Sequence, residues 1–285
     1  MKFREKLERK KFVFTLEIEP PKGIDVDPVV EKIKFLKRKI DAFNVTDMQA
    51  ANLYMSSWAM CVKLKQEEFE PILQLTARDR NVLALQGDLL GSFMLGIENV
   101  LLLTGDVPSS GDHLFAKEVF EVDSVKLIEI ASCLNSGKDL AGNNLKGKTD
   151  FFIGAALNPF AHNIDKEKTK MERKIKAGAS FFQTQPVFDV DKFYDFIKKT
   201  KIDLPIIAGV IFLKSPSMAK YLNENVSGIE IPSEYIKRLK KARGYREEAK
   251  KIVRQIIVKL KDICAGVHFM PFGWYKEVEE VLSNL

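Results

Sequence analysis

Carboxylate and amide side chains interrupt two otherwise apolar segments of the sequence. Glu17 stands in the run Leu16-Glu17-Ile18, and Gln183 and Gln185 stand two residues apart in a later run. Alternate residues of a strand share a face, so Glu17 should point inward if its neighbours point outward, and the two glutamines should share a face. A carboxylate buried in this way has a raised pKa and suits a general acid, with a structural ion pair as the alternative. Amides that both donate and accept hydrogen bonds suit recognition of the edge of a heterocycle.

A charged segment and a glycine–aspartate pair each follow an apolar run. Arg78-Asp79-Arg80-Asn81 stands where a loop would enter a helix, so Asp79 or Asn81 can cap that helix beside a local ion pair. The functional alternative aims the two guanidinium groups at a phosphate. In Thr104-Gly105-Asp106 the glycine would let the backbone approach a flat ring, although the same residues could form a simple turn.

The other polar residues limit the kinds of catalytic site that the chain could form. We find no Ser/His/Asp set and no site for a thiolate nucleophile, and the three histidines are scattered, which argues against a metal site. His268 is alone in an apolar run and is predicted to be a hydrogen-bonded core residue. Carboxylate, amide, threonine and arginine side chains remain. This set suits a flat polar heterocycle and chemistry that an organic cofactor supplies.

The elements that must position these residues recur with a regular spacing. Eight apolar or β-branched runs cover 12–18, 42–46, 71–76, 99–104, 151–157, 180–187, 205–212 and 266–272. Most begin roughly 25–35 residues after the last, the length of a βα unit. Between them, apolar residues recur at helical spacing, as in 29–36, 83–93 and 252–260.

This alternation predicts an α/β fold, a (β/α)8 TIM barrel that forms a single domain over 1–285. An open doubly wound sheet is the alternative, and the lack of Gly-x-Gly-x-x-Gly after the first run weakens a dinucleotide-binding fold. A long loop is expected over 107–123 and an extra helical segment over 227–244. In such a barrel the C-terminal ends of the strands carry the chemistry, so the polar residues should meet at one mouth.

Length and composition bound the class of protein. The chain has 285 residues, 46% of them hydrophobic and 29% charged, which is typical of a soluble globular protein and excludes a disordered, collagen-like or disulfide-scaffold chain. Cys61, Cys133 and Cys264 lie far apart, so we do not expect this chain alone to hold zinc or an iron–sulfur cluster. The free cysteines, together with the lack of a signal-peptide core and of a membrane-spanning run, predict a cytoplasmic protein.

The formal net charge of +6 has three interpretations. Basic and acidic residues alternate on predicted helix faces, as over 168–174, which is typical of solvated helix surfaces. A small anionic ligand is the next interpretation. Nucleic-acid binding comes last, because it would need the positive charge gathered on one face with motif support.

Taken in chain order, the strand ends resemble those of the methylenetetrahydrofolate reductase family. The matching motifs are Glu17-x-Glu19-Pro20-Pro21, Val45-Thr46-Asp47, Gln74-Leu75-Thr76-x-Arg78-Asp79-Arg80-Asn81, Leu103-Thr104-Gly105-Asp106, Asn158-Pro159-Phe160, Lys176-Ala177-Gly178-Ala179 with Gln183-Thr184-Gln185, and Gly266-Val267-His268. Each motif is weak alone, but the ordered set, from about Phe14 to Gly273, is specific.

The resemblance implies a TIM barrel that binds a flavin, FAD or alternatively FMN, at the C-terminal ends of its strands. It implies reduction of 5,10-methylenetetrahydrofolate to 5-methyltetrahydrofolate by hydride transfer from N5 of the reduced flavin. Glu17 would be the general acid that helps to open the methylene bridge, and Asp106 would be catalytic beside flavin and folate. The implied folate contacts are Glu17, Asp106, Gln183 and Gln185. The implied flavin contacts are Thr46, Gln74, Thr76, Arg78, Asp79, Arg80, Asn81, Thr104, Gly105, Asp106, Asn158, His162 and Lys174.

Three of these positions depart from better-known bacterial members, which carry histidine at Gln74, arginine at Thr104 and tyrosine at Asn158. The resemblance further implies a short form without the S-adenosylmethionine-binding regulatory domain. It leaves NADH, NADPH or a reducing partner protein as the electron donor.

The form Arg78-Asp79-Arg80-Asn81 resembles a branch in which some members work beside a second, cluster-carrying subunit. A second hypothesis is therefore a flavin- or folate-binding subunit of a multi-subunit reductase, with an iron–sulfur or zinc partner subunit. A homo- or hetero-oligomer is expected in either case, with no nucleic-acid partner and no membrane span.

Overall fold

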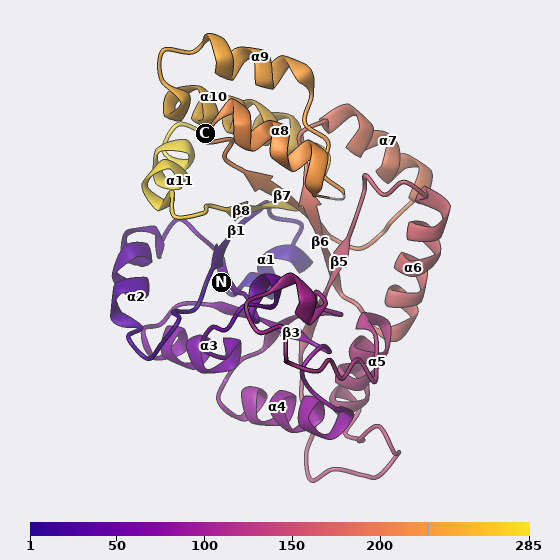
Figure 1. Cartoon of the computed structure of the whole chain (residues 1–285). Coiled ribbons are helices and arrows are strands. Elements are labelled where there is room, and N and C mark those ends of the chain that lie inside the picture. Colours follow the sequence, from indigo (N-terminus) through magenta and orange to yellow (C-terminus); the bar gives the residue numbers. More distant parts are fainter. Residues whose placement is uncertain (227) are drawn as a thin grey trace.

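Eight parallel strands pair in chain order and close into a barrel, β1 to β8, in which β8 pairs with β1 (Figure 1). The structure is a computed structural model and describes residues 1–226 and 228–285. The strands are β1 (Val13–Ile18), β2 (Ala42–Val45), β3 (Pro71–Thr76), β4 (Asn99–Leu103), β5 (Phe152–Leu157), β6 (Phe181–Pro186), β7 (Ile206–Ile211) and β8 (Gly266–Met270). Each predicted run holds one strand, with ends that agree to within two residues. The predicted TIM barrel is confirmed, and the open sheet is excluded.

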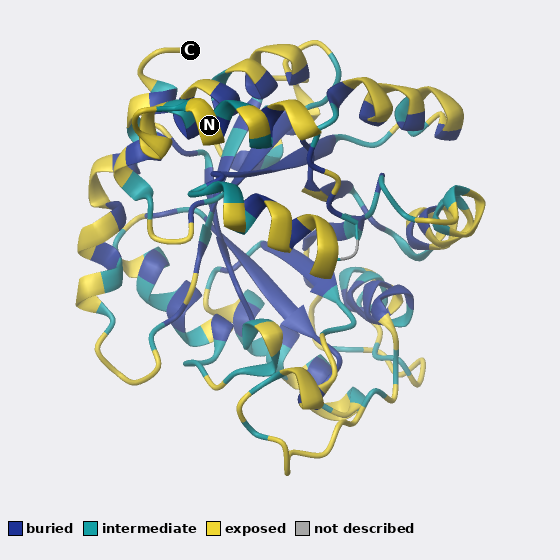
Figure 2. Ribbon diagram, turned by 45° about the horizontal axis from the view of Figure 1, so that its top comes forward, coloured by how far each residue is buried: buried dark blue, intermediate teal, exposed yellow. Residues whose placement is uncertain are grey.

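Helices cover the outside of the barrel and present their apolar faces to it, as the buried and exposed stripes of Figure 2 show. They are α2 (Asp27–Ile33), α3 (Ser57–Gln66), α4 (Val82–Met94), α5 (Ser124–Asn135), α6 (Ile164–Ala177), α7 (Val190–Thr200), α8 (Pro216–Asn225), α10 (Tyr245–Leu260) and α11 (Tyr275–Leu282). The predicted extra segment contains α9 (Ser233–Lys241), although its first residue, 227, lies outside the described residues. No helix within 1–226 or 228–285 is long and apolar enough to cross a membrane.

The N-terminal end of the barrel is closed by the short helix α1 (Phe3–Glu8). Phe3 and Leu7 pack into a buried cluster with inward side chains from the start of the strands, including Phe152 and Phe181. The ring of Phe3 lies edge-on to those of both phenylalanines, with centroids 6.0 and 5.5 Å away. This plug leaves the C-terminal mouth as the end at which polar side chains reach the interior.

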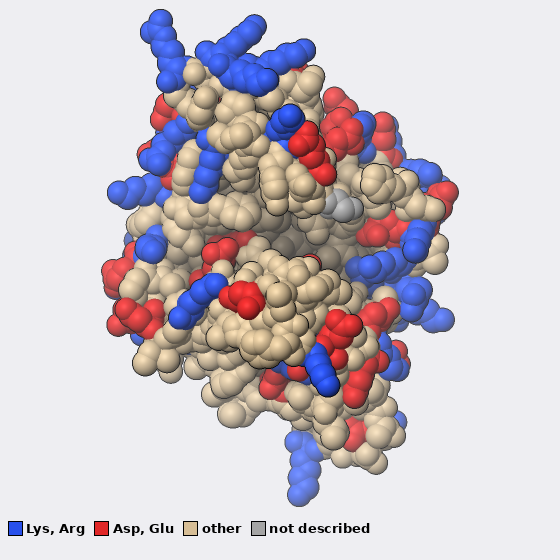
Figure 3. All heavy atoms as spheres, viewed as in Figure 1, with Lys and Arg blue, Asp and Glu red and all other residues tan. Residues whose placement is uncertain are grey.

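Two loops fold against each other at the mouth. One carries the 3-10 turn η2 (Gln49–Ala51), and the other is the predicted loop 107–123, which contains η3 (Pro108–Ser110). A Cβ at Gly111 would lie 1.8 Å from the carbonyl oxygen of Ala51, so only glycine permits this contact. Figure 3 shows the resulting bulge beside a hollow at the centre of the mouth.

Candidate functional site

Glu17 lies inside the barrel, as predicted, and faces a histidine from the neighbouring strand. Its side chain is 11% exposed, and Glu17 Oε2 lies 3.8 Å from Nε2 of His268, whose side chain is fully buried. His268 Nδ1 lies 2.9 Å from the hydroxyl of Thr15, which confirms the prediction of a hydrogen-bonded core histidine. Its Nε2 atom has no hydrogen-bond partner among the residues that the structure describes. Thr15 therefore holds the ring so that Nε2 faces the Glu17 carboxylate.

A second carboxylate and a phenol share the electrostatic environment of Glu17. Desolvation, followed by the charge of Glu17, raises the pKa of Glu19, and the ammonium of Lys214 opposes this. Burial, followed by the charges of Glu19 and Glu17, raises the pKa of Tyr275 to about 12. The phenol is therefore a permanent hydrogen-bond donor at neutral pH.

An amide pair spans the barrel from β2 to β6. Nδ2 of Asn44 donates to Oε1 of Gln183 at 2.7 Å, and both residues are buried. Asn44 Oδ1 remains buried with no partner within the described part of the chain. Such an orphaned acceptor in a polar interior is suited to a donor from a ligand or a water molecule. Asn44 was not among the predicted site residues, although its position two residues before Thr46 places it on the same face of the strand.

Gln185 does not share the setting of Gln183. The pairing of β6 with β7 shifts between Gln183 and Pro186, and the Thr184 hydroxyl accepts a hydrogen bond from the Gly209 N–H at this irregularity. The simple alternation behind the prediction of a common face for the two glutamines is interrupted there. Gln183 is buried, whereas Gln185 is exposed at the rim.

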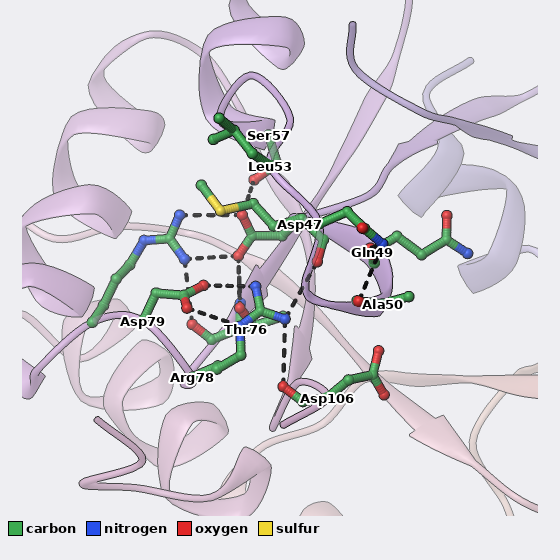
Figure 4. Close-up of polar contacts among 12 residues, drawn as sticks. Asp47, Gln49, Ala50, Leu53, Ser57, Thr76, Arg78, Asp79 and Asp106 are labelled. Atoms are coloured by element: carbon green, nitrogen blue, oxygen red, sulfur yellow. Dashed lines mark hydrogen bonds and ion pairs between the residues drawn. The ribbon is translucent and has the colours of Figure 1, made fainter. Parts of the chain in front are cut away.

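A buried carboxylate, Asp47, connects the ends of β2 and β3 (Figure 4). Its side chain has no exposed surface. Asp47 accepts hydrogen bonds from the Thr76 N–H and hydroxyl, both at 2.9 Å, and from the Ser57 hydroxyl at 3.3 Å. The guanidinium of Arg80 binds both carboxylate oxygens, at 2.7 and 3.1 Å. Asp47 was not predicted as a site residue, because nothing local marks the Asp47–Arg80 pair.

Arg78 joins three segments beneath the mouth. Its guanidinium forms a two-pronged pair with Asp79, at 2.8 and 2.7 Å, and also donates to the carbonyls of Met48 and Asp106, at 3.3 and 3.5 Å (Figure 4). Asn81 caps α4 by accepting from the Ala84 N–H at 2.9 Å, which confirms the capping interpretation with its local ion pair. Carboxylates thus engage both arginines, Arg78 through Asp79 and Arg80 through Asp47.

Backbone geometry brings the loop after β4 close to these residues. Gly105 has φ +95°, and a Cβ at this position would lie 3.1 Å from the Cβ atoms of Thr76 and Arg78. Glycine is therefore needed for both the conformation and the close contact. The side chain of Asp106 is exposed at the mouth, and Thr104 accepts a hydrogen bond from the Ser124 N–H at 3.1 Å.

The β5 side of the mouth holds a buried cation and a hollow. Nζ of Lys174 donates to the carbonyl of Ala156 at 2.5 Å, and burial lowers the pKa of Lys174 to about 8. His162 is exposed and lines a hollow of about 410 Å³ between α6 and α7. Asn158 lies against Gly228, whose missing Cβ would be 2.4 Å from Asn158 Nδ2.

The remaining predicted residues lie on the same mouth. Thr46, Gln74 and Thr76 are buried where β2 and β3 end. The structure therefore brings the predicted residues to one end of the barrel, with His162 and Gln185 on its periphery. Polar amides, an orphaned acceptor, a glycine surface and a buried lysine fit a flat polar heterocycle that carries anionic groups.

One known protein family, and individual proteins named for its activity, are similar to this chain in sequence. The family described as methylenetetrahydrofolate reductase matches residues 2–285. "Methylenetetrahydrofolate reductase 1" of Schizosaccharomyces pombe is 24% identical over 244 residues, which cover 79% of this chain and 37% of that protein. "5,10-methylenetetrahydrofolate reductase" of Buchnera aphidicola is 25% identical over 232 residues, which cover 76% of this chain and 70% of that protein. The chain thus spans about a third of the length of the yeast relative.

Solved structures share the fold at low identity. An uncharacterized protein from Clostridium thermocellum that binds two copies of 5-methyl-5,6,7,8-tetrahydrofolic acid has a TM-score of 0.67, with 16% identity and 99% coverage of both chains. 2,3-Dimethylmalate lyase has a TM-score of 0.56, with 10% identity and coverage of 99% of this chain and 81% of the lyase chain. These likenesses establish the barrel architecture alone. The family match over residues 2–285 shows that the chain belongs to the methylenetetrahydrofolate reductase family.

Proposed function

We propose that this barrel reduces 5,10-methylenetetrahydrofolate to 5-methyltetrahydrofolate with a bound flavin, FAD or FMN. The observation that carries the proposal is the inward Glu17 carboxylate, held opposite His268 in the mouth of a chain that belongs to this family. The folate bound by the structural relative from Clostridium thermocellum supports the substrate class.

The mouth has the features that a flavin site requires. Asn44 Oδ1 offers an unused acceptor, Gly105 presents bare backbone, and Lys174 places a cation beside the end of β5. Thr46, Gln74 and Thr76 add polar surface. A bound reduced flavin would supply the hydride, and the side chains would bind, orient and protonate.

Glu17 is placed to deliver a proton to the substrate. Opening of the methylene bridge leaves a nitrogen that must take up a proton, and an acid whose side chain is 11% exposed, as that of Glu17 is, can donate it. A His268 ring that accepts at Nδ1 from the Thr15 hydroxyl carries its own proton on Nε2, facing Glu17. His268 therefore acts as a positioning residue for the Glu17 carboxylate.

Asp106 and the amides would orient the two ligands. The Arg78 guanidinium donates to the Asp106 carbonyl, and the exposed Asp106 carboxylate forms no ion pair within the described residues. Gln183, with its Oε1 bonded to Asn44, retains an NH₂ group that can donate to the pterin edge. Gln185 at the rim can reach a part of the folate that extends outward.

Substitution of Glu17 by glutamine tests the proposal, because the variant keeps the shape of the side chain and removes the acid. The purified wild-type protein should be yellow. Glu17→Gln should bind flavin and accept electrons normally, while reoxidation by the folate slows by roughly a hundredfold or more. Stopped-flow absorbance separates the two half-reactions.

Glu19→Gln is the matched control, since Glu19 is a neighbouring carboxylate that is exposed at the rim. It should leave both half-reactions close to wild type. Normal folate reduction by Glu17→Gln would remove Glu17 from the acid role, and a colourless protein that takes up neither FAD nor FMN would overturn the flavin proposal.

A further inference from the structure

The positive charge of the chain is concentrated in one segment. Residues 237–261 contain eleven Lys and Arg and two acidic residues, a formal charge of +9, so the rest of the chain carries −3 of the total of +6. The alternation of charge that holds in α6 therefore does not extend to α9 and α10. Figure 3 shows these Lys and Arg side chains gathered over α9 and its neighbours, whereas basic and acidic groups are mixed elsewhere on this face.

Most of these cations are not used to stabilise the fold. Arg238 and Arg246 pair with Glu248 and Glu277, and Lys250 is also paired. Seven other cations are exposed and form no ion pair within the described residues: Lys237, Lys240, Lys241, Arg243, Lys251, Lys259 and Lys261. Three of the seven, at positions 237, 240 and 241, lie within about one turn of one another and form a stripe on α9. An unpaired stripe of like charge destabilises a helix slightly and therefore needs another explanation.

Both ends of the α9 segment are anchored on the mouth side of the barrel. Before α9, Glu230 pairs with Lys192 at the start of α7, and Gly228 lies against Asn158, just after β5. After α9, the Arg246 guanidinium lies 5.1 Å from the centroid of the Trp274 ring, which follows β8. Helix α9 and the start of α10 therefore form part of the rim around the proposed flavin site, whereas the C-terminal end of α10 leads to the start of β8.

We infer that this cationic rim, α9 with the N-terminal half of α10, is the docking surface for a small acidic electron-carrier protein that reduces the bound flavin. The inference rests on the proposed function. A carrier must approach the mouth to exchange electrons, and the formal charge of +5 on residues 233–252, which span α9 and the first half of α10, steers a compact anionic partner to this rim. Tyr245 and Tyr221, 45% and 61% exposed, supply the aromatic contacts typical of protein interfaces.

Reduction of the flavin needs no reactant other than the carrier and protons from solvent. An iron–sulfur carrier is oxidised by one electron in each encounter, and two encounters reduce the flavin by two electrons, with protons taken from solvent. The carrier supplies its own cluster.

The test measures binding of a plant-type [2Fe–2S] ferredoxin to the flavin-loaded protein by calorimetry, at low and at near-physiological salt. Wild-type binding should weaken as salt rises. The triple variant Lys237→Glu, Lys240→Glu, Lys241→Glu should bind at least about tenfold more weakly, because it reverses the stripe that steers the carrier. Circular dichroism and thermal melting confirm that the variant is folded.

The matched control reverses three exposed lysines, Lys138, Lys146 and Lys148, in the loop before β5, which lies at the opposite end of the barrel. It makes the same change in net charge and should leave ferredoxin affinity within about twofold. Both triple variants should still transfer hydride from chemically reduced flavin to folate, so a failure of docking is distinguishable from a failure of the proposed function.

Three results would overturn the inference. These are no salt-sensitive ferredoxin binding by the wild type, equal losses in the two triple variants, or tighter binding of a short DNA duplex than of ferredoxin at the α9 stripe. The last result would make the surface a nucleic-acid site.

Discussion

Removal of the Asp47 carboxylate should destabilise the barrel strongly. The side chain is fully buried, and its two oxygens accept from Arg80, Thr76 and Ser57. Asp47→Ala leaves the Arg80 guanidinium, which is 11% exposed, with Asp88 as its remaining carboxylate at 3.0 Å. Removing one partner of a buried ion pair lowers the free energy of unfolding by about 3–5 kcal/mol. About 1–3 kcal/mol of that loss arises because the Thr76 N–H no longer has an acceptor. Since Asp88 compensates in part, we expect a loss of about 3–4 kcal/mol.

Urea denaturation followed by circular dichroism measures this loss as a change in the free energy of unfolding. Asp47→Asn keeps the size of the side chain and an acceptor for Thr76, so it should lose only about 2 kcal/mol. Asp88→Asn is the control: Asp88 binds the same arginine but is 32% exposed, and its loss should stay below about 1 kcal/mol.

The test depends on the order in which the three variants lose stability. If Asp47→Ala were no more destabilising than Asp88→Asn, the buried network would not hold the ends of β2 and β3 together. The same conclusion would follow if added salt removed the difference, because buried pairs are screened much less than exposed ones.

Three further substitutions probe other parts of the mouth. Gly105→Ala should lower the free energy of unfolding by about 1–3 kcal/mol and weaken flavin retention. The reason is that φ at Gly105 is +95° and the new Cβ would lie 3.1 Å from the Cβ of Thr76. An unchanged thermal midpoint would contradict this expectation. Lys174 has a pKa lowered from 10.5 to about 8, so between these pH values the unfolded chain binds a proton that the folded chain lacks. The free energy of unfolding of the wild type should therefore rise with pH across this window relative to Lys174→Met, by at most roughly 3 kcal/mol, which paired urea titrations would measure. His268→Gln should slow folate reduction about tenfold and shift its pH profile while flavin reduction is unchanged, whereas equal slowing of both half-reactions would deny a positioning role toward Glu17.

The strands could be predicted from the sequence because each is a nearly continuous apolar run with polar flanks. β3 matches its predicted range, and α4 follows its apolar spacing to within about a turn. The plug helix α1 could not be predicted in this way, because only Phe3 and Leu7 of its six residues are buried. Its role depends on the width of the closed barrel, which is not a local property of the sequence.

The candidate site was predicted in part, for a related reason. Glu17 stands out as a lone charge in an apolar strand, whereas Asp47 is recognisable only through Arg80, 33 residues later. The two glutamines of β6 stand at the spacing of a shared face, but a shift in pairing with β7 interrupts the alternation, and only Gln183 is buried. Local pattern therefore identifies which residues are unusual, and tertiary pairing decides what they contact.

The pairing of β1 with β8 shows how the barrel converts residue types into a site. Thr15 is paired with His268, and Val13 with Gly266, so the threonine and histidine side chains lie side by side within the barrel. A Cβ at Gly266 would lie 2.4 Å from the carbonyl oxygen of Val13, so the close approach of the two strands at this point depends on glycine. A shift of one residue would turn His268 outward and bring an apolar neighbour in its place. The orientation of His268 toward Glu17 thus follows from a backbone contact at the opposite end of the same strand pair, and a side chain at Gly266 should disturb the proposed acid without touching it.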